Sequence, residues 1–200
     1  MFLKKPLVII FLVLLIDQTI KYWVKTTMYL GQEHHVMGNW FIIHFTENNG
    51  MAFGMQLGGG YGKLFLSTFR ILVAMIGGGY LFRLSRKNAH PGLIASGSLL
   101  LAGAIGNIID STFYGRLFSE SSHQLATFLP ASGGYAGWFH GKVVDMFYFP
   151  LIATHFPSWF PFWANEDFVF FRPVFNIADS CITTGIPRNL ADTRTGKLKS

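Results

Sequence analysis

Three long apolar runs constrain the fold of this 200-residue chain more than any other feature. They lie at about residues 6–24, 64–84 and 92–109. A helix needs roughly 20 mostly apolar residues to cross about 30 Å of hydrocarbon, and each run is close to that length. Charged residues make up only 13% of the chain, about half the share found in an average soluble domain. The runs therefore predict membrane-spanning helices, and the composition argues against a soluble domain or a disordered chain.

A fourth apolar segment begins near Pro173 but is short. From Val174 to Ile186 there are thirteen residues, which make about 20 Å of helix. A polar tail follows. We therefore expect a short or truncated fourth span over about 173–186, within a single integral membrane domain that covers residues 1–200.

Basic residues predict the orientation of the spans. Lys4 and Lys5 precede the first run, and a basic loop at 83–87 separates the second run from the third. The positive-inside rule places both on the cytoplasmic side, so the segments 25–63 and 110–172 face outward. The formal net charge of +6 then has a topological explanation, and no nucleic-acid partner is expected.

The outward-facing segments show weaker local signals. Residues 40–46 form a β-prone run that is followed by turn residues. The segment 114–142 is rich in Gly and Ser, which favours a mobile surface loop. Residues 156–171 alternate aromatic, proline and polar side chains, which indicates an interfacial loop.

Two aspartates lie among apolar neighbours on the outward side. Asp145 and Asp179 each stand where an ionisable group is costly, which makes both candidates for function. If two carboxylates come within hydrogen-bond reach they share one proton. One can then activate a water while the other polarises a carbonyl, which is peptide hydrolysis without a metal. Each aspartate alone is equally compatible with a satisfied interfacial polar group.

Other polar residues in the runs have simpler explanations. Asp17 and Lys21 stand at i and i+4 in the favourable order and can neutralise each other. Asn107 and Asp110 share one helix face. The single cysteine, Cys181, excludes an internal disulfide, and the sequence has no HExxH, GxSxG or Walker motif.

Five segments in order resemble the lipoprotein signal peptidases, or signal peptidase II. They are DQTIK at 17–21, NNGMAFG at 48–54, GNIID at 106–110, VVDMF at 143–147 and FNIADS at 175–180. The resemblance implies an all-α membrane protein, a four-helix transmembrane bundle with a small periplasmic β-element and an interfacial loop. It also implies a multi-pass protein of the bacterial inner membrane with its active site toward the periplasm.

The resemblance further implies an aspartyl endopeptidase that cleaves prolipoproteins before a diacylglyceryl-modified cysteine. Its catalytic residues would be Asp145 and Asp179. The residues that line the substrate site would be Asn48, Gly50, Asn107 and Asn176, and the structural supports would be Asp17, Lys21 and Asp110. No metal or organic cofactor is implied. The implied partners are the lipidated substrate, membrane lipids and globomycin-type cyclic peptides, and the enzyme would act as a monomer.

The chain departs from the family pattern in two further places. Ser111 follows the GNIID segment where the family usually has arginine, and Arg116 is a nearby replacement. The segment 111–142 is also longer than the usual connector. The competing hypotheses are a small transporter or proton-conducting subunit that uses the same acids as a relay, and a structural lipid-associated protein.

Overall fold

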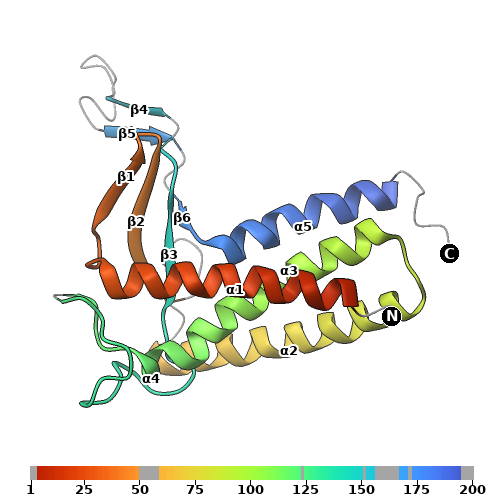
Figure 1. Cartoon of the computed structure of the whole chain (residues 1–200), viewed down its shortest axis with the longest axis horizontal. Coiled ribbons are helices and arrows are strands. Elements are labelled where there is room, and N and C mark those ends of the chain that lie inside the picture. Colours follow the sequence, from red (N-terminus) through yellow and green to blue (C-terminus); the bar gives the residue numbers. More distant parts are fainter. Residues whose placement is uncertain are drawn as a thin grey trace.

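The computed structural model shows a bundle of long helices with a β-sheet standing at one end (Figure 1). It describes residues 4–49, 59–122, 124–150, 152–155, 167–170 and 173–194. We call the end of the bundle that carries the sheet the sheet end. The N-terminus and the loop between the second and third helices lie at the opposite end (Figure 1).

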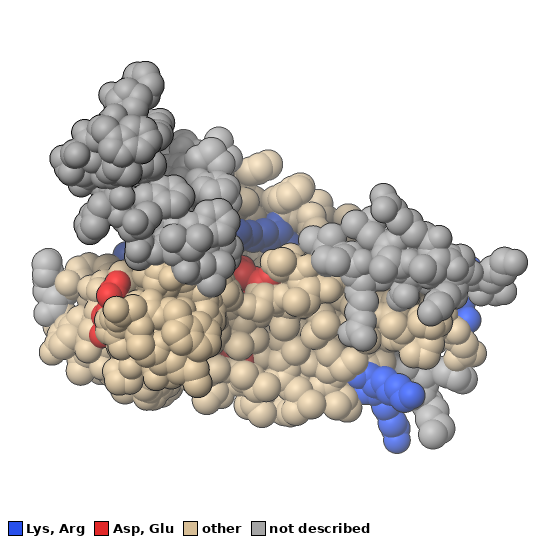
Figure 2. Space-filling view, turned by 90° about the horizontal axis from the view of Figure 1, so that it is seen from above, with Lys and Arg blue, Asp and Glu red and all other residues tan. Residues whose placement is uncertain are grey.

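Three helices are long and apolar enough to cross a membrane, which confirms the three predicted spans. They are α1 (Lys4–Thr27), α2 (Gly59–Arg86) and α3 (Pro91–Ile109). Many of their large apolar side chains point outward; Phe11, Phe65 and Ile76 are 63%, 66% and 65% exposed. Figure 2 shows the matching surface, on which charged residues occupy only small areas of the visible face. Such a surface suits contact with lipid rather than water.

The third helix does not end at Ile109. It continues as a π-helical segment, η2 (Asp110–Tyr114), and a short turn, α4 (Gly115–Leu117). Segments of π-helix inside longer helices often occur at functional sites. Here the segment begins at Asp110, whose side chain is fully buried.

The β-element is a four-stranded antiparallel sheet in the order β1-β2-β3-β6. Its strands are β1 (Glu33–Met37), β2 (Phe41–Asn48), β3 (Val143–Tyr148) and β6 (Val174–Phe175), while β4 (Ile152–His155) and β5 (Asp167–Phe170) form a separate pair. The predicted run at 40–46 is confirmed by β2. The small β-element expected beside the helices is present as this sheet, and its central strand β3 carries Asp145. Most of the predicted interfacial loop at 156–171 lies outside the described residues.

The last helix, α5 (Ile177–Arg194), begins later than expected. Pro173 does not open it, because Val174 and Phe175 pair with β3 as strand β6. The helix packs on α3 at close range, and α3 has a glycine at the contact. Among the described residues only α1, α2 and α3 with its extension meet the requirements for a membrane span, so a fourth span is not confirmed.

The segment from Leu117 to Lys142 is a folded part of the structure rather than a loop without fixed contacts. Leu129 N–H donates to Leu117 O at 2.7 Å, and Tyr135 N–H donates to Phe118 O at 3.0 Å. Phe118 and Ala126 belong to the buried apolar cluster that joins α1 to the sheet. The Gly- and Ser-rich composition therefore gave the wrong expectation for its packing.

The close packing of α3 against α5 predicts that Gly103→Ala destabilises the protein. A Cβ at position 103 would overlap the Ala178 carbonyl oxygen and approach Ile182 Cγ1 to 2.8 Å. We expect the free energy of unfolding to fall by about 1–3 kcal/mol. The control is Gly79→Ala on α2, where nothing lies within 4 Å and the change stabilises by up to about 1 kcal/mol. Thermal unfolding in detergent measures both, and equal effects would contradict the packing argument.

Candidate active site

Asp179 is fixed by the first turn of its own helix. Asn176 caps α5, since Asp179 N–H donates to Asn176 Oδ1 at 2.9 Å. In return Asn176 N–H donates to Asp179 Oδ2 at 3.4 Å. This reciprocal pattern is a capping box, with Asn at the N-cap and Asp three residues later. The local sequence therefore sets where the Asp179 carboxylate points.

Asn176 also joins Asp179 to Asp145. Its Nδ2 donates to Asp145 Oδ1 at 2.7 Å and to Val144 O at 3.2 Å. Asn176 is fully buried, and Asp145 is 4% exposed. One amide side chain thus hydrogen-bonds both to the strand that carries Asp145 and to the helix that carries Asp179.

Asn107 on α3 is a second amide bridge. Its Nδ2 donates to Asp179 Oδ1 at 2.9 Å, and its Oδ1 accepts from Lys21 Nζ at 3.1 Å. The Asn176 amide donates to the same Asn107 Oδ1 at 3.2 Å. The structure therefore brings Asn107, Asn176, Asp145 and Asp179 together at the sheet end of the bundle.

A buried ion triad lies directly behind these amides. Lys21 Nζ contacts Asp17 Oδ2 at 2.9 Å and Asp110 Oδ2 at 2.7 Å, and all three side chains are at most 1% exposed. Asp17 Oδ1 accepts from Ala178 N–H at 3.0 Å, and Asp110 Oδ2 accepts from Val144 N–H at 3.3 Å. The triad thus ties α1 and α3 to the segments that carry the two central aspartates.

The surroundings of Asp145 favour its protonated form. Burial, and after it the neighbouring Asp179 carboxylate, raise the pKa of the Asp145 carboxyl from an ordinary 3.8 to about 7. Lys21 and hydrogen bonds from Asn176 and Asn48 act in the opposite direction. An acid whose pKa lies near neutrality can hold or give up a proton under ordinary conditions.

The remaining predicted residues differ in their placement. Asn48, on β2, is a hydrogen-bond partner of Asp145. Gly50 lies outside the described residues. Ser111 donates through Oγ to Asn107 O at 2.9 Å, so it braces the π-helical turn. Arg116 is exposed and lies over the Trp138 ring, with 5.9 Å to the centroid.

Two residues near the site carry roles that the sequence did not predict. Gln18 donates to Asp17 Oδ2 at 3.1 Å and to Asp110 Oδ1 at 3.0 Å. The signal for Gln18 in the sequence was an amide side chain directly beside Asp17 in an otherwise apolar helix. Arg70, within the second apolar helix α2, has a buried Nη1 and interacts electrostatically with both Asp145 and Asp179.

No cluster of three or more His, Cys, Asp or Glu side chains suited to a metal ion occurs in the part of the chain that the structure describes. The structure places two carboxylates, with amides and cations around them, in this region. The fold and this site together define a membrane protein with a paired-carboxylate centre at the sheet end of its helices.

Comparison with known proteins places this chain in a family. Residues 9–192 match the family model described as Signal peptidase (SPase) II. The chain is 58% identical over 179 residues to a lipoprotein signal peptidase of Porphyromonas gingivalis, which covers 89% of this chain and 77% of the relative. It is 37% identical over 186 residues to the lipoprotein signal peptidase of Amoebophilus asiaticus, covering 92% and 75%. The chain belongs to the signal peptidase II family, a family of proteases.

Two solved structures have a similar fold. Both are described as structures of a bacterial membrane enzyme obtained by the in meso method, at 2.3 Å and 1.9 Å resolution. The first has a TM-score of 0.61 at 26% identity and covers 98% of this chain and 93% of its own. The second has a TM-score of 0.60 at 25% identity, covering 94% and 92%. The similarity therefore extends over the whole fold, sheet included.

The raised pKa of Asp145 predicts a pH-dependent stability change in Asp145→Asn. The folded protein keeps this proton up to a pKa of about 7, whereas the unfolded chain loses it near 3.8. Stability from this group is therefore present at low pH and is lost as the pH rises toward 7. We expect Asp145→Asn to raise the Tm by about 5 °C at pH 8 and to change it little at pH 4. Thermal unfolding at the two pH values checks this, and an equal effect at both would contradict the assigned pKa.

Proposed function

We propose that this protein is an aspartyl endopeptidase that removes signal peptides from prolipoproteins before a diacylglyceryl-modified cysteine. The observation that carries the proposal is the Asn176 amide, which hydrogen-bonds to Asp145 and caps the helix turn of Asp179. The family assignment supports the substrate class, because the matched relatives are lipoprotein signal peptidases. The same comparisons give no support to a transporter or a proton-conducting subunit.

In the proposed reaction the two aspartates share one proton and play different roles. Asp145 has a pKa near 7 and is the acid that donates a hydrogen bond to the scissile carbonyl oxygen. Asp179, whose oxygens accept from Asn107 Nδ2 and Asn176 N–H, is the ionised base. It takes a proton from a water, and the hydroxyl oxygen bonds to the carbonyl carbon. As the hydroxyl oxygen adds, the proton of Asp145 moves to the carbonyl oxygen. When the C–N bond breaks, Asp179 gives the proton that it took from water to the leaving amine, and Asp145 regains its own proton.

The proposed enzyme is a single membrane domain. Its three apolar helices cross the bacterial inner membrane, and α5 packs along α3 as a fourth, shorter helix. The basic loop after α2 lies in the cytoplasm, so the sheet end and the two aspartates face the periplasm. The enzyme acts as a monomer, and globomycin-type cyclic peptides compete with the lipidated substrate for the site. Asn48, Gly50, Asn107 and Asn176 line or support the substrate site.

The proposal predicts that either aspartate is indispensable. Asp145→Asn and Asp179→Asn keep the size and one acceptor oxygen of the side chain, but the amide can neither give up nor take a proton as a carboxyl group does. We expect each variant to reduce kcat by roughly 10³-fold or more. Cleavage of a diacylglyceryl prolipoprotein by the purified protein in detergent measures this.

The matched control for the two variants is Glu33→Gln, which neutralises a half-exposed carboxylate on β1. It should cleave at the rate of the unaltered protein. Turnover retained in either aspartate variant would remove that residue from the catalytic pair. No cleavage by the unaltered protein, or cleavage that globomycin does not reduce, would contradict the proposed function itself.

The shared proton also predicts an alkaline limit to activity. Asp145 must be protonated to act as the acid, and its pKa is about 7. The cleavage rate should therefore fall as the pH rises through about 7, with a slope that corresponds to the loss of one proton. Initial rates between pH 5 and pH 9 measure this fall, which is the alkaline limb of the pH–rate profile. A rate that stays constant across this range would show that Asp145 is not the acid.

A further inference from the structure

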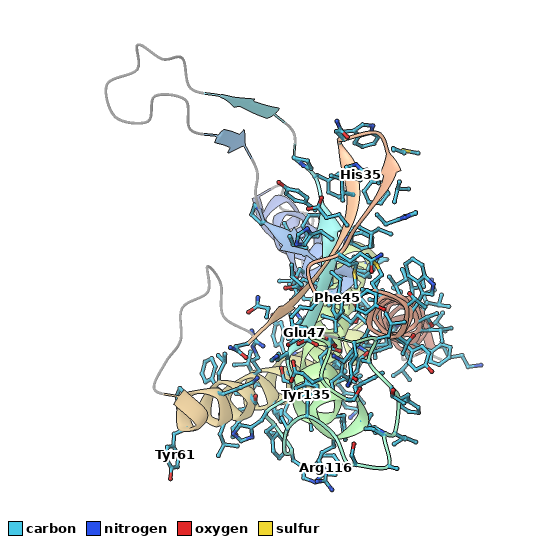
Figure 3. All side chains as sticks on the ribbon, turned by 90° about the vertical axis from the view of Figure 1, so that its left-hand side faces the viewer. His35, Phe45, Glu47, Tyr61, Arg116 and Tyr135 are labelled. Atoms are coloured by element: carbon cyan, nitrogen blue, oxygen red, sulfur yellow. The ribbon has the colours of Figure 1, made fainter. Side chains whose placement is uncertain are left out.

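A second buried cluster of charges lies outside the catalytic pair, between α1, β2 and the segment that follows α4. Lys25 Nζ contacts Glu47 Oε1 and donates to Ser121 Oγ at 2.9 Å. Lys142 Nζ contacts Glu47 Oε2 at 3.0 Å. We call these four side chains, Lys25, Glu47, Ser121 and Lys142, the Glu47 clamp. Figure 3 shows Glu47 between Phe45 and Tyr135, where β2 meets this segment.

The clamp is costly to bury. The Lys25 side chain is fully buried and that of Glu47 is 2% exposed. Aromatic rings surround the ammonium group, with Lys25 Nζ 5.0 Å from the ring centroid of Tyr135 and 5.5 Å from that of Phe118. Removing both charges from water costs about as much as their attraction returns, so such a pair adds little net stability. Its value lies in the geometry that it fixes.

Strand β2 connects the clamp to the proposed catalytic pair. Neighbouring residues of a strand point to opposite faces, so Glu47 faces the clamp while Asn48 faces the other side. In the register of the sheet Asp145 pairs with Thr46, two residues before Asn48, which places Asn48 on the face of Asp145. The Asn48 side chain hydrogen-bonds to the Asp145 carboxyl. The clamp thus holds one face of β2, and the other face presents Asn48 to Asp145.

We propose that Glu47 is a positioning residue: the clamp fixes the end of β2 so that Asn48 reaches Asp145. This proposal gives a role to the segment from Leu117 to Lys142, because that segment supplies Ser121 and Lys142 to the clamp. Tyr135 orients this part of the chain, since its Oη accepts from Lys142 N–H at 2.7 Å. The inference rests on the proposed function, in which Asp145 is the acid.

A positioning role for Glu47 predicts the direction in which the pKa of Asp145 changes when the clamp is lost. The hydrogen bond from Asn48 favours the ionised carboxylate, so its loss raises the pKa of Asp145. The charged groups that act on Asp145 are Asp179 from α5, Lys21 from α1 and Arg70 from α2, and none of them is altered in the test.

The deciding variant is the double substitution Lys25→Met with Glu47→Gln. It removes one positive and one negative charge, so the net charge near Asp145 is unchanged. Lys142, which loses its Glu47 partner, would lower the pKa of Asp145, so an upward shift reports the lost Asn48 hydrogen bond. We expect the alkaline limb of the pH–rate profile to move upward by about half to one pH unit. We also expect kcat on the plateau to fall roughly tenfold while KM changes less. Initial rates with a lipidated prolipoprotein between pH 5 and pH 9 measure both.

A second variant keeps the test decisive if the double variant does not fold. Ser121→Ala removes one neutral partner of Lys25 and Glu47, and it should move the limb in the same direction by a smaller amount. The control is Glu120→Gln at the exposed rim, which contacts Lys142 at 3.4 Å and should leave the profile unchanged.

The two proposals fail in different ways. A limb that stays in place or moves downward in the folded variants overturns the positioning role of Glu47 and leaves the proposed function intact. An unaltered protein that does not cleave the prolipoprotein overturns the proposed function instead. A normal profile in Ser121→Ala alongside an unfolded double variant also overturns the positioning role, because the clamp would then be only structural.

Discussion

The rest of the structure depends on one buried cation. Lys21 lies between Asp17 and Asp110 and joins α1 to α3 inside a bundle whose long helices expose many large apolar side chains. Loss of one partner from such a triad leaves a buried charge unpaired and lowers the free energy of unfolding by about 3–5 kcal/mol. Each carboxylate of the triad also accepts the backbone N–H of a residue that immediately precedes a central aspartate: Ala178 before Asp179 and Val144 before Asp145. The triad therefore sets the spacing between α5 and β3.

Helix length and apolar composition predict most of the bundle but not its last helix. The length of the apolar runs directly predicts the spans that contain Asp17 and Asn107, because an apolar run long enough to cross the hydrocarbon layer has few other stable structures. The start of α5 is different, since Pro173 and the apolar residues after it resemble a helix start. Strand β3 offers an unpaired edge, and Val174 and Phe175 pair with it, which moves the helix start to Ile177. A long-range pairing overrides a local signal here.

The sequence predicted the two central acids and the supports Asp17, Lys21 and Asp110, but it did not predict the Glu47 clamp. Asp145 and Asp179 stand out because charge is rare among their neighbours. Lys25 continues the face of Asp17 and Lys21 at the same four-residue interval, but whether it faces lipid, water or Glu47 depends on the fold of residues distant in sequence. Composition likewise predicted a surface loop for the segment that supplies Ser121. In each case the missing information was a tertiary contact.

The choice of amides between the charges is itself a functional constraint. Lys21 reaches Asn107, and Asn107 in turn reaches Asp179, so one neutral side chain separates the cation from the carboxylate. A direct ion pair would favour the ionised form of its partner. In the proposed reaction the two aspartates share one proton, so their environment should fix them in place without holding both of them ionised. The hydrogen bonds of Asn107 and Asn176 do this better than an ion pair, because an amide favours the ionised form less than a full positive charge does.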